Sequence, residues 1–563
     1  MKSRARGRGV RLLLLVLLLL SAVVPPLQAQ ESPPDPILAL MERMSPEARV
    51  GQLVLITYPG VDVDDTSEIV SLVEAYGVGG ILLRPQNGNF GPSGITPTEL
   101  VSITDRLQTA AWFASQAPSA PSVAEPGTGM PSPFVPLLIA TQASDGEATP
   151  SEFVTGAIDL PSPMALGATW DPGLAQAVGA VLGRELADVG VNLYLGPDLD
   201  VLYTPRPGDD ADLGTKAFGA DPFWVGELGT AYIAGLHEGS GARLLVVPRH
   251  LPGLGSADRP LEDEVPTVQK PLEQLKQIEL APFFAATKSL PGASADAADG
   301  FLVTHIRYRG FQGNNIRRTT RPISLDAPAL QLVTSLKEVL PWREAGGLLV
   351  ADNLGLASVH LSYDPTGQTF NARRVMQDAL SAGNDLLILD RFAPQGGDNW
   401  PAHFANVRDT LSYLASRYRD ESTFRALVDQ AVYRVLSAKL RLYPEFSLDA
   451  VLRGPLEERS DLDAMDASVV SPVALAALTR IFPLSDDLLP PPPQEGESIV
   501  VFTQEGRAAG GDETVSVNAL EGDDIPQAIL RFYGPEGTEV VSSNLVQGFT
   551  YSDLLDALAL PGV

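Results

Sequence analysis

Hydrophobic residues recur along the chain in short, nearly continuous runs, separated by longer stretches whose apolar positions have helical spacing. Their Val, Ile and Leu content is typical of strands buried on both faces, as in parallel sheets covered by crossover helices. Asp171–Val189 and Pro222–Glu238 have amphipathic spacing and start at an Asp-Pro pair, which suits a helix cap and first turn. The pattern predicts repeated β–α units. The eight expected strands are Gln52–Ile56, Gly79–Leu83, Pro136–Ala140, Val191–Leu195, Arg243–Val247, Gly300–Thr304, Gly346–Ala351 and Asp385–Leu389.

The number of these units indicates the fold class. Eight strands and their crossovers within about 350 residues match an α/β fold of the TIM (β/α)8 barrel type that carries insertions. A doubly wound open sheet is the structural alternative. However, no G-x-G-x-x-G fingerprint follows an early strand, so the barrel is favoured.

The rest of the chain predicts further segments. Leu488–Pro493 is a proline-rich spacer, and the apolar runs Ser498–Phe502 and Ile529–Tyr533 are expected to be strands of a second, small α/β unit. The expected organisation is therefore a signal peptide (1–29), the barrel (30–445), a helical and proline-rich linker (446–494) and a partial second α/β domain (495–563).

The N-terminal residues indicate export. Five basic residues, ending with Arg11, precede the apolar run Leu12–Leu20, and the small residue Ala29 is a suitable cleavage point. The run is short for a transmembrane span, so we expect a secreted protein without stable membrane insertion after cleavage. An uncleaved N-terminal anchor is the alternative.

Composition excludes several functions. The formal net charge of -29 makes nucleic acid an unlikely partner, and the absence of cysteine excludes disulfides and thiolate nucleophiles. The five histidines lack metal-binding spacing, and neither a phosphate-binding loop nor a Gly-x-Ser-x-Gly elbow occurs. We therefore expect no metal and no cofactor. The oligomeric state does not follow from the sequence.

Polar residues that could carry chemistry follow four of the expected strands. Gly196–Val201 follows the fourth, Arg249–Gly255 the fifth, His305 the sixth and Asp352–Gly355 the seventh. Active sites of TIM barrels lie at the carboxyl ends of the strands, so these segments are expected to meet at one rim.

These segments resemble the family 3 glycoside hydrolases, in particular their β-N-acetylhexosaminidase branch, from about Met44 to Leu389. Met44–Leu53 resembles the family's M-[ST]-x-E-x-K-V-G-Q-L, and Lys216–Pro222 is similar to R-S-F-G-x-D-P. Arg249–Gly255 is similar to K-H-F-P-G-H-G, and Ala351–Leu356 to S-D-D-L-G-M.

The resemblance implies a carbohydrate substrate, with β-N-acetylhexosaminides or β-glucosides as the expected classes. It implies that Asp352 is the catalytic nucleophile and that His305 lines the sugar subsite. The residues that it places against sugar hydroxyls are Asp200, Lys216, Arg249 and His250. A retaining glycosidase also needs a general acid, about 5 Å from the nucleophile.

The sequence departs from the family at that acid. The family branch uses an Asp-Ser-His dyad, whereas Pro260 and Glu262 stand at the positions of its aspartate and histidine. Gln142 also replaces a sugar-binding aspartate. Two hypotheses remain: Glu262, or Asp258 or Asp263 nearby, serves as the acid, or the barrel is a catalytically impaired pseudoenzyme that binds carbohydrate or cell wall. The retained Asp352 favours a hydrolase.

Overall fold

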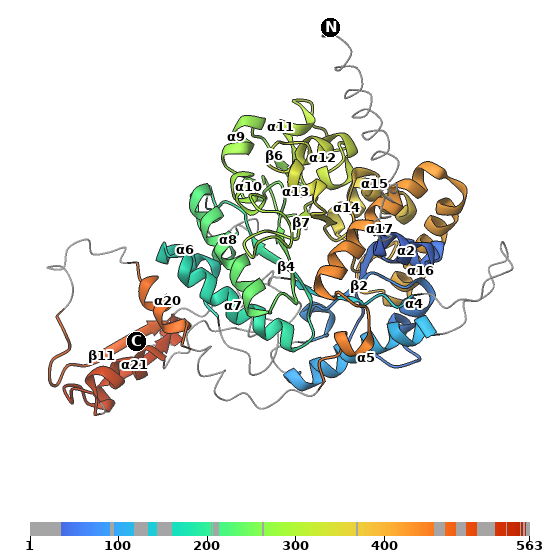
Figure 1. The fold of residues 1–563 in the computed structure, drawn as a ribbon. Coiled ribbons are helices and arrows are strands. Elements are labelled where there is room, and N and C mark those ends of the chain that lie inside the picture. The colour runs from blue at the N-terminus through green and yellow to red at the C-terminus, as the bar shows by residue number, and fades with distance from the viewer. Residues whose placement is uncertain are drawn as a thin grey trace, which may run out of the picture. The chain divides into compact units, whose positions relative to one another are not determined.

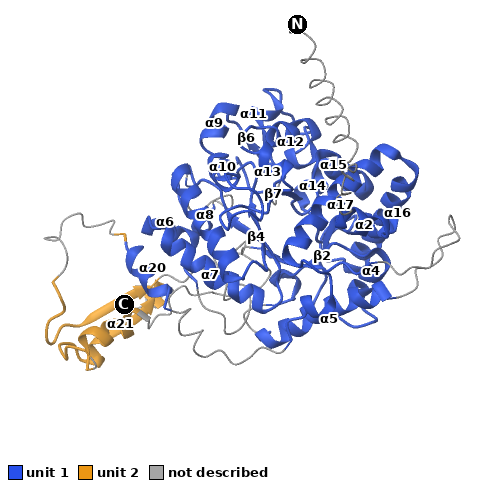
Figure 2. Cartoon of the chain, viewed as in Figure 1, with its two compact units in different colours: residues 1–478 blue, residues 479–563 orange. Residues whose placement is uncertain are grey.

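The structure is a computed structural model that describes residues 35–90, 95–116, 133–142, 160–203, 205, 213–261, 264–367, 370–454, 468–479, 491–503, 524–535, 537–551, 553–554 and 558. The expected signal peptide lies outside these residues. The chain divides into two compact units, Met1–Leu478 and Thr479–Val563 (Figure 2).

The first unit contains a parallel sheet of eight strands, in the order β5-β4-β3-β2-β1-β10-β9-β7. The sheet closes between β5 and β7, where the Leu251 amide donates to Leu302 O (2.8 Å) and the Thr304 amide donates to Leu251 O (3.1 Å). This confirms the predicted barrel, and each strand overlaps one of the eight predicted runs. The strands are β1 (Val54–Ile56), β2 (Gly80–Leu82), β3 (Leu138–Gln142), β4 (Leu193–Asp198), β5 (Leu245–Arg249), β7 (Gly300–Val303), β9 (Leu348–Ala351) and β10 (Leu386–Leu389).

Helices surround the strands, as Figure 1 shows for the labelled β2, β4 and β7. The predicted Asp-Pro starts are confirmed: Asp171 accepts the Gly173 amide (2.8 Å) and Asp221 accepts the Phe223 amide (2.9 Å). The longer helices are α4 (Glu68–Tyr76), α5 (Pro97–Gln116), α7 (Pro172–Asp188), α8 (Pro222–Gly239), α12 (Ala327–Thr334), α15 (Ala372–Ala382), α16 (Trp400–Asp420) and α17 (Ser422–Leu442). The shorter ones are α2 (Pro36–Glu42), α3 (Pro46–Gly51), α6 (Pro163–Thr169), α9 (Leu272–Gln277), α10 (Ala281–Ala286), α11 (Arg309–Gln312), α13 (Leu340–Glu344), α14 (Ala357–Tyr363), α18 (Leu448–Val451) and α20 (Val470–Ala476).

A buried lysine fastens α17 to the amino ends of two strands. Lys439 Nζ donates to Gln52 Oε1 and to Gly79 O, both at 2.8 Å, and the side chain is completely buried. Burial lowers the pKa of Lys439 well below its ordinary value. Within the described residues, no helix is both long and apolar enough to span a membrane.

A small parallel sheet joins the segment after β5 to the segment after β7. It consists of β6 (Thr267–Val268) and β8 (Arg307–Tyr308). The buried Arg307 guanidinium strengthens this connection by donating to Val265 O (2.8 Å), Arg318 O (2.7 Å) and Thr320 O (2.7 Å). The long loop after β5 is thereby held at the barrel wall.

The described part of the second unit has two parallel strands, β11 (Ile499–Thr503) and β12 (Val546–Thr550), and the helix α21 (Asp524–Tyr533). The prediction of a strand at Ile529–Tyr533 was wrong, because this run lies in α21. A run with four apolar residues in five fits a strand or the buried stripe of a helix equally well, and Pro526, three residues before it, suits a first helical turn.

Candidate active site

The carboxyl ends of neighbouring barrel strands carry the polar residues singled out from the sequence. Since β4, β5, β7 and β9 are neighbours around the closed barrel, Asp200, His250, His305 and Asp352 each lie just beyond the end of a strand on one rim. This is the end of a TIM barrel at which active sites form.

A buried ion pair joins the ends of β4 and β5. Arg249 Nε donates to Asp198 Oδ1, and the two side chains are only 4% and 3% exposed. The Leu199 amide also donates to Arg249 O (2.7 Å), so the backbone holds the two strand ends together. An ion pair buried this deeply needs close geometry to offset its loss of hydration, and the aligned strands supply it.

Asp200 orients His250. His250 Nδ1 donates to Asp200 Oδ2 (2.7 Å), and the Leu254 amide donates to Asp200 Oδ1 (2.6 Å). Asp200 is fully buried, whereas the His250 side chain is 12% exposed, and among the described residues its Nε2 has no protein partner. Burial lowers the pKa of His250, but the charge and hydrogen bond of Asp200 outweigh burial and raise it overall. His250 is therefore a fixed donor at the rim.

Among the described residues, three side chains of this cluster could together hold a cation. One ligand atom each from Asp198, Asp200 and His250 lies within 4.8 Å of the others. However, Asp198 is paired with Arg249, and both oxygens of Asp200 already accept hydrogen bonds. These contacts favour an internally balanced cluster that binds a neutral polar ligand.

The loop after β9 holds Asp352 in place. The Asp352 amide donates to Val303 O on β7 (3.1 Å), and the Leu354 amide donates to Ile388 O on β10 (2.9 Å). The buried Asn353 side chain accepts the amides of Gly355 (2.9 Å) and Asp390 (3.1 Å). The partly buried Asp352 carboxyl thus extends from a loop fixed on both sides.

His305 stabilises the loop after β9 by contacting the backbone of Asn353. Its ring is completely buried, with Nδ1 2.6 Å from Ser324 Oγ and Nε2 3.0 Å from Asn353 O. A carbonyl can only accept, so Nε2 carries the proton. Burial lowers the pKa of His305, which keeps the ring neutral. With both nitrogens occupied inside the protein, His305 acts on the position of the Asp352 loop.

Two nominated residues remain, Lys216 and Glu262, and the structure describes only the first of them. Lys216 ends the short 3-10 helix η3 (Gly214–Lys216) in the long loop after β4 and is partly buried. Glu262, nominated as the acid, and Asp263 both lie outside the described residues.

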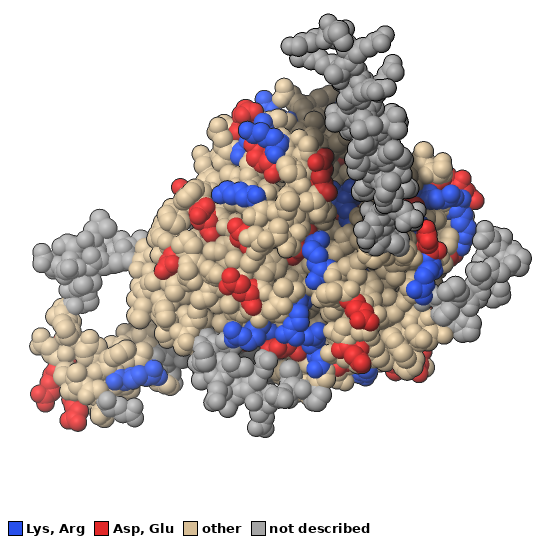
Figure 3. Space-filling model, in the orientation of Figure 1, with Lys and Arg blue, Asp and Glu red and all other residues tan. Residues whose placement is uncertain are grey.

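The described carboxylates next to Glu262 belong to a surface ion network. Asp258 Oδ1 accepts the Thr267 amide (2.7 Å), and Asp258 also pairs with Arg259 (3.1 Å). Glu264 pairs with Arg259 (2.8 Å) and Arg318 (3.4 Å). On the face shown in Figure 3, acidic and basic side chains are likewise interspersed. These contacts give Asp258 and Glu264 structural partners, and the assignment of the acid to Glu262 stays a prediction.

Sequence reasoning missed one polar residue on the rim. Asp390 follows β10, is 1% exposed, and accepts from Thr57 Oγ1 (2.7 Å), Asn87 Nδ2 (3.0 Å) and Arg84 Nη1 (2.5 Å). Burial raises the pKa of Asp390, but Arg84 and the other donors outweigh burial and lower it overall. Its position just after the eighth apolar run was a visible signal.

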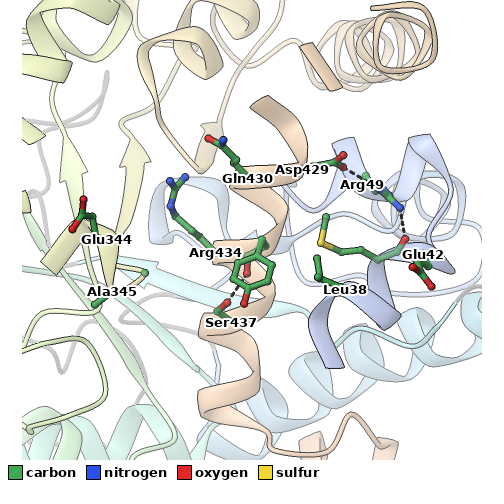
Figure 4. Close-up of a pocket in the computed structure, with 12 residues that line it drawn as sticks. Leu38, Glu42, Arg49, Glu344, Ala345, Asp429, Gln430, Arg434 and Ser437 are labelled. Carbon is green, nitrogen blue, oxygen red and sulfur yellow. Dashed lines mark hydrogen bonds and ion pairs between the residues drawn. The ribbon is translucent and has the colours of Figure 1, made fainter. Parts of the chain in front are cut away.

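A cavity of about 770 Å³ lies at the opposite end of the strands (Figure 4). It is bounded by α2, α17 and the turn Glu344–Gly346, which directly precedes β9. Arg49 and Asp429 form an ion pair at its wall (2.7 Å). None of the residues nominated from the sequence lines this cavity, so we place the candidate active site at the carboxyl rim.

Comparison with known proteins finds related sequences. The β-hexosaminidase A of Pseudoalteromonas piscicida is 25% identical over 360 residues, which cover 62% of this chain and 54% of that protein. The β-hexosaminidase of Hydrogenovibrio crunogenus is 28% identical over 218 residues, covering 38% of this chain and 51% of that protein. The chain thus spans about half the length of these curated relatives.

Among solved structures, the family 3 β-N-acetylglucosaminidase of Paenibacillus sp. str. FPU-7 has the same fold. Its TM-score is 0.62 at 21% identity, and the match covers 83% of this chain and 74% of that one. The family model described as glycosyl hydrolase family 3 N terminal domain matches residues 46–438, which is more than half of the sequence. This chain therefore belongs to glycosyl hydrolase family 3.

Proposed function

We propose that the protein is an exported glycoside hydrolase that cleaves β-N-acetylhexosaminides or β-glucosides by a retaining mechanism, with Asp352 as the nucleophile. One observation carries this proposal: a fixed carboxylate and a buried, charge-balanced donor cluster lie on the same rim of a family 3 barrel. The names of the curated relatives support the hexosaminide class.

In this mechanism the rim binds the sugar and Asp352 attacks its anomeric carbon. His250 Nε2 and Arg249 face the sugar hydroxyls, and Asp200 keeps the imidazole oriented through its hydrogen bond to Nδ1. The locked loop after β9 holds the Asp352 carboxylate on one face of the sugar, where it forms the glycosyl-enzyme bond as the leaving group departs. His305 positions this loop through its contact with Asn353 O, and its predicted place in the lining of the sugar subsite stays a prediction.

Protonation of the leaving group is assigned to Glu262. Carboxylic acids can replace histidine as general acids when their surroundings raise the pKa, and Asp258 and Glu264 are engaged in ion pairs. The same acid, once deprotonated, would activate the water that hydrolyses the glycosyl-enzyme intermediate.

The second candidate function is a carbohydrate-binding module. Pro260 stands at the position of the dyad aspartate, and the two described carboxylates flanking Glu262 are occupied, which favours a site that binds without efficient cleavage. Binding would then use the same Arg249 and His250 cluster.

Leaving-group dependence separates the two functions. Without an acid, aryl glycosides with good leaving groups should be cleaved slowly, whereas natural oligosaccharides need protonation. We expect Asp352→Asn to abolish both activities, and Glu262→Gln to slow oligosaccharides far more than aryl glycosides. N-acetylglucosaminides and glucosides are assayed separately. No turnover of any aryl glycoside, together with sugar binding that survives Asp352→Asn, would leave the binding module as the function.

Export is part of the proposal and is tested independently. The basic residues and the apolar run before Ala29 support it. A reporter fused after Pro36 should appear outside the cytoplasm, and retention of the fusion inside the cell would contradict export.

A further inference from the structure

Tyr203 is an exposed aromatic residue three positions beyond Asp200. Its side chain is 55% exposed, although the residue before it, Leu202, is buried. Leu202 donates its amide to Gly219 O (2.9 Å) and packs in a small apolar cluster with Leu213. The backbone next to Tyr203 is therefore anchored, close in the chain to Asp200.

The ring of Tyr203 rests against the loop that carries the proposed acid. Lys270 Nζ lies over the ring, 4.5 Å from its centroid. Lys270 is 16% exposed, so this cation–π contact is partly shielded from water and stronger than an open surface contact. The exposed part of Tyr203 remains open to a ligand.

A buried polar triad fixes Lys270 in turn. Its ammonium pairs with Glu279, which is fully buried, and donates to Ser256 Oγ (2.6 Å). The Ser256 hydroxyl donates to Glu279 Oε1 (2.7 Å), while Glu279 Oε2 has no partner within the described residues. Ser256 and Lys270 are the first and last residues of the acid segment, which we define as 256–261 and 264–270. The triad therefore supports both the stem of this segment and Tyr203.

We propose that Tyr203 is the platform on which the leaving sugar stacks. The inference rests on the proposed function, in which the acid protonates the oxygen between the two sugars and the leaving sugar must lie along the acid segment. A rigid, exposed aromatic ring offers the C–H face of a sugar a large contact area at little entropic cost. Lys270 fixes the ring. Asp200, three residues before Tyr203, orients His250, which is proposed to bind the other sugar.

The test compares substrates with and without a leaving sugar. We expect Tyr203→Ala to lower kcat/KM roughly three- to tenfold for β-linked N-acetylglucosamine disaccharide or cellobiose, whichever the wild type cleaves. A glycosyl fluoride, which has no leaving sugar, should lose far less. Tyr203→Phe, which keeps the ring, should stay close to wild type on both. Phe113→Ala, which removes an exposed aromatic residue of α5, is the matched control.

Two results would overturn the platform: an unchanged disaccharide rate in Tyr203→Ala, or equal losses on disaccharide and fluoride, which would indicate a disturbed loop. A binding measurement distinguishes failure of the platform from failure of the proposed hydrolase function. Disaccharide affinity is measured by calorimetry on Asp352→Asn protein with and without Tyr203→Ala. The platform predicts weaker binding for the double variant even if the wild type cleaves nothing, and equal binding would reject it.

Discussion

The loop that carries Asp352 and the segment proposed to carry the acid are held by different kinds of interaction. Asn353 and His305, which fix the first, are at most 7% exposed and use hydrogen bonds to backbone groups. The acid segment has buried backbone contacts, from Arg307 to Val265 O and between β6 and β8. Its described carboxylates, however, pair with Arg259 and Arg318, whose side chains are 45% and 68% exposed. Exposed ion pairs are worth little and are screened by salt, whereas losing a buried hydrogen-bond partner is costly.

This difference matches the two tasks of a retaining glycosidase. The nucleophile forms a covalent bond and tolerates little displacement, since misplacement by about 1 Å can cost a hundredfold in rate. The acid serves as acid in one step and as base in the next, and it forms no covalent bond with the sugar. The buried triad at Glu279 supports the two ends of that segment, at Ser256 and Lys270.

The largest effect is expected from Asn353→Ala. It removes the acceptor of two buried backbone amides, those of Gly355 and Asp390, so the free energy of unfolding should fall by roughly 2–4 kcal/mol. Turnover should fall as well, because the Asp352 loop loses its support. Urea denaturation measures the stability change.

Asn353→Asp is the matched control for this prediction. It keeps an oxygen that accepts both amides and restores the residue of the S-D-D-L-G-M motif. Its stability should therefore stay near that of wild type. Equal stability of all three proteins would show that the loop does not depend on this side chain.

Much of the barrel could be predicted because each buried parallel strand can be recognised from its own short run of Val, Ile and Leu. The same runs marked the strand ends, and hence Asp352 and His250. The partners of Asp258 and Glu264 could not be predicted, since Arg318 reaches Glu264 only after the chain has passed through β7. The helical structure of Ile529–Tyr533 was missed because an apolar run of that length carries no distinct period.

An intermediate effect is expected from pH at His305. Its pKa is lowered in the folded protein, so the neutral ring contributes stability above the ordinary value of about 6.5, and this contribution is lost as pH falls toward the folded pKa. Between about pH 7.5 and 5 the free energy of unfolding should fall less steeply in His305→Gln than in wild type. His360 and His403, whose pKa burial lowers to about 4, act in the same direction, so the slope is reduced and not abolished.

Urea denaturation at several pH values measures these slopes. His250 acts in the opposite direction, because its raised pKa adds stability below about 6.5 that is lost as pH rises. His250→Gln should therefore steepen the loss on acidification. Identical slopes for wild type and His305→Gln would contradict the assignment of a neutral, buried His305.

The smallest effect is expected at the acid segment. Arg318→Ala removes a single exposed partner of Glu264, so the free energy of unfolding should change by about 0.5 kcal/mol or less. Its functional effect should nevertheless be selective: raising salt from about 0.05 to 0.5 M, or removing Arg318, loosens the segment and slows oligosaccharides, which need the acid. A glycosyl fluoride needs only Asp352 for bond cleavage and should respond much less.

Arg373→Ala, which removes a similarly exposed ion pair with Asp409 on the helices, is the control and should affect neither substrate. Equal salt sensitivity for both substrates would mean that the two loops do not differ as their contacts indicate.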